Sequence, residues 1–201
     1  MSYTYDLIGK LSVSPPLSPA QVAYLQEFSH SYRHKFAPQW QSWPNPLREA
    51  VGLPVGIDGA YISSSMGTGA DFLDNCFQVD TDPPDNQPSF QCCWTTNAQG
   101  NTVHWNKLHR TFAPVEWLNY LIAHFFEPWG VALNGVVQCH GEEEDDRSLI
   151  VVNTNRVRQT GKSEWGAFQA ERATQRQNRR LARRLEKTLT VDTPSAPKRK
   201  V

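Results

Sequence analysis

The charge of this chain changes sign near residue 155, and this division limits where a folded core can form. Residues 1–155 contain 7 Lys and Arg against 16 Asp and Glu, a net charge of −9, whereas residues 156–201 contain 13 against 4, a net charge of +9. The basic residues are concentrated in residues 171–187, ERATQRQNRRLARRLEK. We therefore expect an acidic globular domain followed by a basic segment with a partner of its own.

The composition of the chain favours a well-packed domain in its first part. Seven Trp and nine Phe supply a large buried area per residue, although hydrophobic residues make up only 39% of the chain. No apolar run approaches the length of a membrane span, and the N-terminal segment has neither a charged n-region nor a long apolar h-region. We therefore expect a cytoplasmic protein without a membrane partner.

The four cysteines, Cys76, Cys92, Cys93 and Cys139, are expected to be reduced in that compartment. Cys92 and Cys93 are adjacent in the sequence. In a strand, neighbouring side chains point to opposite faces, so at most one of these two thiols is expected to face the core.

Hydrophobic periodicity predicts an α+β fold for residues 1–158. The predicted strands cover residues 5–13, 90–96, 101–106, 131–139 and 149–158. The predicted helices cover residues 19–35 and 113–129, with a further short helix at 46–51. Without the short helix the order is β-α-β-β-α-β-β, which is typical of a two-layer domain with a mainly antiparallel sheet and two helices on one face.

A capping pattern predicts where the first helix begins, whereas no periodic pattern predicts helices or strands through most of residues 36–90. Ser18 is predicted to cap the first helix, with Pro19 at the first helical position and Gln21 completing a capping box. Residues 36–90 contain many prolines and a glycine-rich stretch, and we expect them to form a long Pro/Gly-rich excursion across the surface.

The segment after residue 158 is predicted to contain a linker at 159–162, a basic helix at 163–190 and a disordered tail at 191–201. At 100° per residue, the basic side chains of this helix fall within roughly 140° of arc. They are Arg172, Arg176, Arg179, Arg180, Arg183, Arg184 and Lys187. Leu181, Leu185 and Leu189 lie on the opposite side, so the predicted helix is amphipathic.

Several long segments occur in a fixed order along the first part of the chain. They are YDLIGKLSVSPPLSPAQVAYL, AVGLPVG, PPDNQPSFQCCW, VEWLNYLIAHFFEPWGVALNG, and the acidic turn GEEEDD before IVVNTNRV. On these segments, residues 5–157 resemble a widespread family of uncharacterised bacterial and phage-borne proteins. The resemblance implies a shared compact fold and a bacterial or phage setting, and it carries no activity to this chain.

The chain departs from the pattern of that family in two places. The sequence before the acidic turn reads VVQCHGEEEDD, where the resemblance implies a Trp-Gln-Gly lead-in to the acidic residues. The basic tail after Arg158 lies outside the resemblance, so its role is expected to be particular to this protein.

The basic helix gives the strongest functional indication in the sequence. Arginines neutralise phosphates and release counterions, fork onto phosphate oxygens and stack on bases. We therefore predict a non-enzymatic binding or accessory protein whose basic residues engage nucleic acid, RNA being favoured, or a ribonucleoprotein complex. The three leucines would then dock on a protein surface. The alternatives for the helix are a solvated element or one docked on its own acidic domain.

The acidic turn supports an alternative function of a different class. It contains Glu142, Glu143, Glu144, Asp145 and Asp146. Through these carboxylates the protein would act as an adaptor or inhibitor that binds a basic protein partner. The turn lacks the spaced acidic pattern of a calcium loop, so a solvated hairpin tip is preferred to a metal site.

No catalytic motif, cofactor or metal site is predicted. The candidate zinc ligands contain no C-x-x-C pair, and they are Cys92, Cys93, Cys139, His104, His109 and His140. The serines at 63–65 belong neither to a nucleophile elbow nor to a phosphate loop. Trp94 and Trp105 could stack bases from a sheet face, although Trp in a small sheet usually belongs to the core.

Overall fold

The computed structural model describes residues 4–31, 46–53, 83, 87–108, 111 and 113–191. The chain divides into two compact units, Met1–Gly161 and Lys162–Val201. The first unit contains the sheet and the shorter helices. The second contains one long helix, α5 (Lys162–Val191). Most of the predicted excursion at 36–90, and the predicted tail beyond residue 191, lie outside the described residues.

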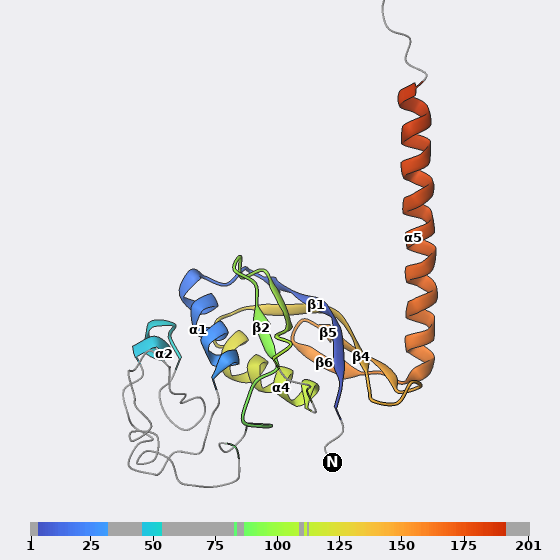
Figure 1. The fold of residues 1–201 in the computed structure, drawn as a ribbon. Helices are drawn as coiled ribbons and strands as arrows, with labels where there is room; N and C mark the ends of the chain where they lie inside the picture. The colour runs from blue at the N-terminus through green and yellow to red at the C-terminus, as the bar shows by residue number, and fades with distance from the viewer. Residues whose placement is uncertain are drawn as a thin grey trace, which may run out of the picture. The chain divides into compact units, whose positions relative to one another are not determined.

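A six-stranded antiparallel sheet forms the first unit, in the order β2-β3-β1-β4-β5-β6 (Figure 1). Its strands are β1 (Asp6–Ser14), β2 (Trp94–Thr96), β3 (Thr102–Trp105), β4 (Ala132–His140), β5 (Arg147–Asn153) and β6 (Arg156–Gln159). The central pair, β1 and β4, is in register over the full length of both strands. The predicted mixed α+β fold with an antiparallel sheet is therefore confirmed.

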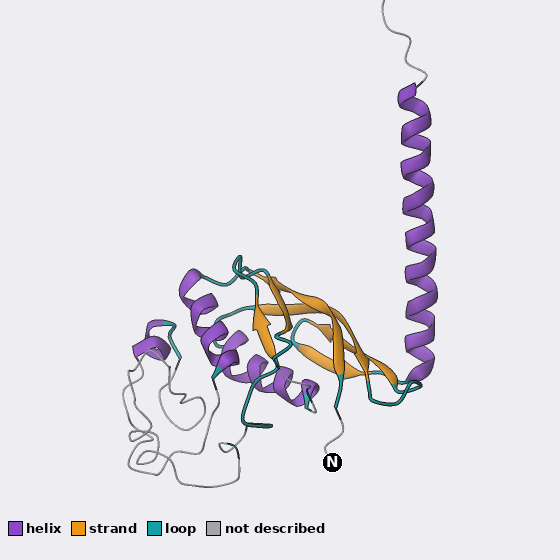
Figure 2. Ribbon diagram, viewed as in Figure 1, coloured by secondary structure: helices purple, strands orange, loops and turns teal. Residues whose placement is uncertain are grey.

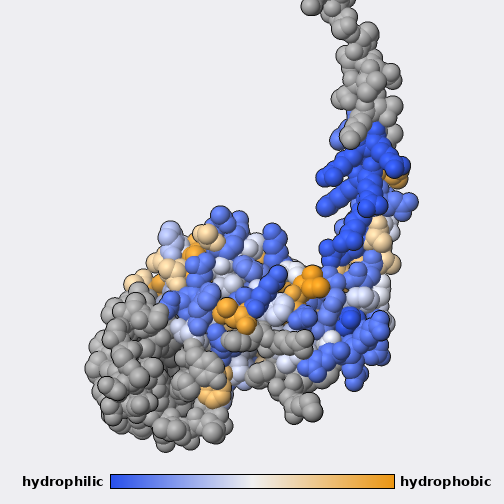
Figure 3. Space-filling model, viewed as in Figure 1, coloured by the Kyte–Doolittle hydropathy of each residue, from blue (hydrophilic) through white to orange (hydrophobic). Residues whose placement is uncertain are grey.

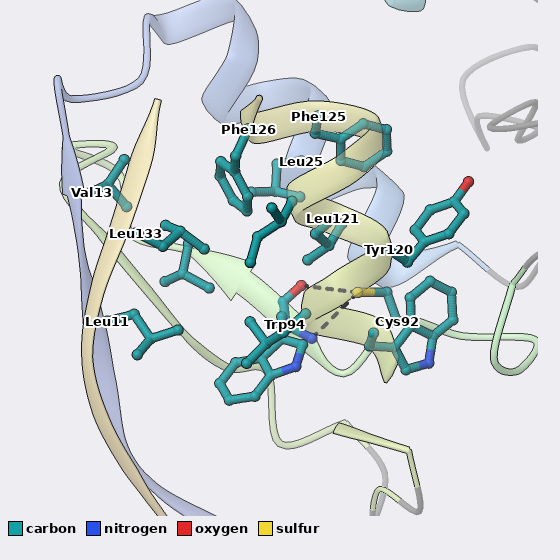
Figure 4. Packing of buried hydrophobic residues seen from close by; sticks show 14 of the residues in the cluster. Leu11, Val13, Leu25, Cys92, Trp94, Tyr120, Leu121, Phe125, Phe126 and Leu133 are labelled. Atoms are coloured by element: carbon teal, nitrogen blue, oxygen red, sulfur yellow. Dashed lines mark hydrogen bonds between the residues drawn. The ribbon is translucent and has the colours of Figure 1, made fainter. Parts of the chain in front are cut away.

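The helices of the first unit lie on one side of the sheet (Figure 2). They are α1 (Pro19–His30), α2 (Pro46–Ala50) and α4 (Pro114–Leu121), and α4 continues as one π-helical turn, η3 (Ile122–Phe126). Between the helices and the strands, Leu25, Leu121 and Phe126 lie in one fully buried cluster with Leu11 and Leu133 (Figure 4).

Helix α1 begins at the predicted residue. The amide of Gln21 donates to Ser18 Oγ at 3.3 Å, and the amide of Ser18 donates to Gln21 Oε1 at 2.9 Å, so the predicted capping box is present. The helix ends at His30, short of the predicted 35. It ends there because Ser31 is extended and directs both its amide and its hydroxyl to the carbonyl of Glu27.

The single strand predicted over residues 149–158 is wrong, because this stretch contains parts of two strands. Thr154 and Asn155, with φ of 46° and 65°, form a tight turn between β5 and β6. Asn155 also ties the turn to β4, because its Oδ1 accepts from the amide of Leu133 at 2.7 Å. The predicted strand order lacked β6 because this turn contains no glycine.

Two other predicted elements differ in detail. The strand predicted from residue 90 begins only at Trp94, so Cys92 and Cys93 precede it and the alternation rule does not apply to them. Both thiols are buried, contrary to the prediction. Cys92 Sγ lies 3.5 Å from both the amide nitrogen and the carbonyl oxygen of Trp94 (Figure 4). The helix predicted over 113–129 is α-helical only to Leu121.

An aromatic cluster joins α1 to α4 and η3. The ring of Phe28 meets Phe125 edge-on, with 4.7 Å between the centroids, and stacks on Tyr120 at 6.2 Å. It also meets Trp117 edge-on at 6.3 Å. Phe28 has no exposed surface. Aromatic pairs of this kind stabilise a core beyond the area that they bury.

Helix α2 is attached to the same cluster through a buried cation. Arg48 is 1% exposed, its Nη1 donates to Tyr24 Oη at 3.0 Å, and its guanidinium lies over the ring of Phe125 at 5.7 Å. Just beyond α2, the carbonyl of Val51 accepts from Trp129 Nε1 at 2.9 Å. These contacts attach α2 and Val51 to the core of the first unit.

We predict that Phe28→Ala lowers the free energy of unfolding by about 3–5 kcal/mol, because it removes the ring at the centre of the cluster. Urea denaturation of the full chain measures this loss. Ile8→Ala is the matched control: its side chain is half exposed on β1, and its loss is about 0.5 kcal/mol or less. Equal losses in the two variants would contradict the central role of the cluster.

Candidate nucleic-acid interface

Helix α5 holds the predicted basic residues on one continuous element. The side chains of Arg176, Arg179, Arg180, Arg183 and Arg184 are all exposed. Arg172 is partly buried, and its guanidinium lies over the ring of Phe168 at 5.6 Å. Lys187 lies within the helix, but its side chain is outside the described part of the structure, as are the side chains of Leu185 and Leu189.

The sequence of α5 accounts for its length. After Gly166 it contains neither glycine nor proline, and it is rich in Ala, Arg, Gln and Leu, which are good helix formers. Thr174 Oγ1 donates to the carbonyl of Ala170 at 3.1 Å, and Gln175 Nε2 donates to Glu171 Oε1 at 3.2 Å. Hydrophilic side chains cover much of the helix in the view of Figure 3.

Leu181, which was predicted to dock on a protein surface, is 49% exposed. A leucine with half of its surface in water gains free energy when a partner covers it. The exposure of Leu181 is thus compatible with the predicted docking role.

The acidic turn between β4 and β5 is organised by the basic residue that follows it. Nη1 of Arg147 donates to the carbonyls of Asp146 at 3.1 Å and Glu143 at 3.2 Å, and to that of Gly141 at 3.5 Å. On the other side of the turn, Glu142 Oε1 accepts from the amide and the hydroxyl of Thr4 at 3.1 and 2.5 Å.

The turn therefore presents its carboxylates from a fixed backbone. The side chains from Glu142 to Asp145 are exposed, and Asp146 is partly buried. The sequence pattern predicted a solvated tip and did not indicate the part played by Arg147. The available signal was a single arginine directly after five acidic residues, because a cation there can reach back to the turn carbonyls.

The candidate metal ligands do not come together in the described residues. Across the described part of the chain, no group of three His, Cys, Asp or Glu side chains lies close enough to share a metal ion. Burial raises the pKa of Cys93 well above its usual value, and burial raises that of Cys139 to about 12. Both thiols are therefore protonated at neutral pH and poorly nucleophilic. His109, Cys76 and the serines at 63–65 lie outside the described residues.

The two strand histidines are also poor candidates for acid–base chemistry. Burial lowers the pKa of His104, and the charges of Lys10 and Lys107 lower it further. Burial, followed by the charge of Arg147, lowers the pKa of His140. Both side chains are therefore neutral at neutral pH.

The aromatic side chains of the β2–β3 hairpin belong to the core. Trp94 has no exposed surface, and its Nε1 donates to the carbonyl of Pro114 at 2.9 Å. Trp105 is partly buried and packs against the core cluster. The interpretation of Trp94 as a core residue is therefore correct, and its ring cannot stack on a base.

No family model, no curated protein and no solved structure matches this chain. Within the described ranges, none of the helices combines the length and the apolar character needed to cross a bilayer.

We predict that iodoacetamide leaves Cys92, Cys93 and Cys139 unmodified in the native protein at about pH 8, because all three thiols are buried and burial raises the pKa of Cys93 and of Cys139. Mass spectrometry of peptides from native and guanidinium-denatured protein measures the labelling of each site. All three should label after denaturation. Native labelling of Cys139 at the rate of a small-molecule thiol would contradict the protection that we infer from burial.

Proposed function

We propose that this protein is a non-enzymatic nucleic-acid-binding accessory protein, and that α5 contacts the phosphates of RNA or of a ribonucleoprotein complex. The observation that carries the proposal is the run of exposed arginines on successive turns of α5. Arginine donates to phosphate oxygens in a planar fork and also stacks on bases, whereas lysine offers only a point charge. The preference of this helix for arginine therefore favours RNA over a purely electrostatic partner.

The periodicity of α5 gathers these side chains into one basic face. At 100° per residue, its six arginines and Lys187 fall within roughly 140° of arc. The three acidic residues of the helix, Glu164, Glu171 and Glu186, fall outside that arc by the same geometry. By the same periodicity, positions 181, 185 and 189 fall opposite the basic arc, so α5 is proposed to be a basic amphipathic helix.

The length of the basic face suits a phosphate backbone. At about 1.5 Å per residue, the face from Arg172 to Lys187 extends over about 22 Å. One strand of a duplex spaces its phosphates about 3.4 Å apart along the axis, so this face spans about six of them. The face therefore offers about one cation for each phosphate within its reach.

We predict that the triple variant R176A/R179A/R183A binds a fluorescein-labelled single-stranded RNA of about 12 nucleotides at least about tenfold more weakly at low salt. Each arginine removed should lower the magnitude of the slope of log K against log salt by about 0.7, or about 2 for the triple variant. Fluorescence anisotropy of the full chain over a salt series measures both quantities.

The matched control is T174A/Q175A/N178A, which changes three residues of α5 outside the basic arc. It should bind the RNA with the affinity and salt slope of the unaltered protein. A second variant, R176K/R179K/R183K, separates charge from arginine geometry, because it keeps the salt slope and loses only the fork and stacking contacts. Wild-type RNA affinity in the alanine variant would overturn the proposal.

The fixed acidic turn favours a second candidate function, that of an adaptor or inhibitor for a basic protein partner. A docking surface gains affinity when its charges are held in place before the partner arrives. Arg147 and Thr4 hold the backbone and one carboxylate of this turn. The side chains from Glu142 to Asp145 are thereby presented together on one exposed turn.

For this second function, we predict that E143Q/E144Q/D145N abolishes binding of a labelled peptide of about eight alternating Lys and Arg residues. The matched control, E49Q/E116Q/E127Q, removes the same charge from exposed positions in the helical layer and should leave peptide binding unchanged. Titration by anisotropy compares the two. Equal weakening in both variants would show that net charge, and not the turn, attracts the peptide.

A further inference from the structure

Two neighbouring rows of side chains on α5 line a groove of about 580 Å³. Residues four apart on a helix form inclined ridges, and adjacent ridges are offset by three residues. One ridge consists of Arg176, Arg180 and Arg184, and the other of Ala173, Gln177 and Leu181. The groove therefore has a cationic wall and an uncharged wall, and it belongs to the second unit alone.

The cationic wall suits the phosphates of the RNA proposed for α5. Arg176 and Arg180 are exposed, and their guanidinium groups can fork onto phosphate oxygens. At about 1.5 Å per residue, these two positions are about 6 Å apart along the helix axis. Phosphate contacts carry no sequence information and use only this ridge. They therefore leave the uncharged wall of the groove without a role.

The uncharged wall has the chemistry of a nucleobase site. Gln177 and Leu181 are both exposed. The aliphatic side chain of Leu181 can cover the face of one base, and the small side chain of Ala173 leaves room at the other end of the groove. The amide of Gln177 offers one donor and one acceptor side by side. This pair is the complement of the N7 acceptor and the N6 donor of adenine.

The size of the groove favours one unpaired nucleotide over a duplex or a protein helix. Sites that hold a small molecule have volumes of about 300–1,000 Å³, and the groove lies in this range. In an RNA duplex the bases are paired, and the deep, narrow major groove hides their edges from side chains. A partner helix would need apolar anchors on successive turns. Leu181, however, is the single large apolar side chain among the six described residues that line the groove.

We infer that this groove binds an unpaired adenosine nucleotide of a single-stranded RNA. Arg176 and Arg180 hold the flanking phosphates. The amide of Gln177 donates to N7 and accepts from N6 of the adenine, and Leu181 covers the face of the base. The inference rests on the RNA-binding function proposed for α5 and deepens it, because it names a base and the residue that selects it. Leu181 thereby contacts a base and not a protein surface.

Three fluorescein-labelled RNAs test the choice of base. The first is a single strand of about 12 nucleotides, all uridine except for one central adenosine, and the second contains uridine only. In anisotropy titrations the full-length protein should bind the first strand at least about fivefold more tightly, because a bidentate contact discriminates between bases. The third strand carries 7-deazaadenosine at the centre. It lacks the N7 acceptor and should bind like the uridine strand.

Substitution of single residues identifies the side chain that selects the base. Gln177→Ala should bind both natural strands with the affinity of the wild-type protein for the uridine strand, and its salt slope should not change, because no charge is removed. The matched control is Gln175→Ala, which lies outside the groove and should retain the preference for adenosine. Leu181→Ala should weaken binding of both strands by about threefold, because the base face loses its apolar contact. Circular dichroism verifies that each variant is helical.

Three results would overturn the inference. The first is equal binding of the adenosine and uridine strands by the wild-type protein. The second is a preference for adenosine that survives in Gln177→Ala, which would place the selection of the base elsewhere. The third is loss of binding to an acidic amphipathic peptide in Leu181→Ala with RNA binding unchanged, which would make the groove a protein site.

The variant R176A/R179A/R183A separates a failure of this inference from a failure of the proposed function. Loss of RNA binding in that variant, together with equal binding of the two strands by the wild-type protein, overturns only the inference about the groove. In that case α5 contacts phosphates alone. RNA affinity at the wild-type level in the same variant overturns the proposed function and the inference together.

Discussion

The packing of α1 against the π-helical turn η3 is the contact on which the rest of the first unit depends. In η3 the amide of Glu127 donates to the carbonyl of Ile122, five residues earlier, at 2.9 Å. Within this turn Phe125 and Phe126 are adjacent and both fully buried. Phe125 meets Phe28 in the aromatic cluster, and Phe126 lies with the leucines between helices and sheet (Figure 4). The turn thus connects the two halves of the core.

The aromatic cluster also holds one cation of the first unit, Arg48, in a buried position. A buried guanidinium is stable only when its charge and its N–H groups are satisfied, and Arg48 meets part of this need through Tyr24 and the ring of Phe125. Arg147 is occupied by the carbonyls of the acidic turn. Both of these cations therefore serve the structure of the first unit, one in its core and one at its acidic turn.

Sequence patterns predicted the features that depend on neighbouring residues. The capping box of Ser18 and Gln21 involves one turn of chain, and the arc of arginines on α5 follows from helical periodicity alone. The turn at Thr154 and Asn155 was missed because two non-glycine residues adopt positive φ there, and Asn155 is held by its bonds to Leu133 in β4 and to Val131 just before it. In the same way, Lys10 and Arg158 come to lie in one row across the sheet, with Val136 and Val151 between them, and this row follows only from the pairing of four strands.

The two proposed charged sites differ in physical basis. On α5, guanidinium groups stand on an exposed helix, so binding there would draw its free energy from counterion release and would weaken steeply with salt. At the acidic turn, the hydrogen bonds of Arg147 hold the backbone that carries the carboxylates, so binding of a basic partner there would gain affinity from charges that are already held in place. The charge division along the chain would then correspond to two separate kinds of recognition, of phosphates by α5 and of basic side chains by the acidic turn.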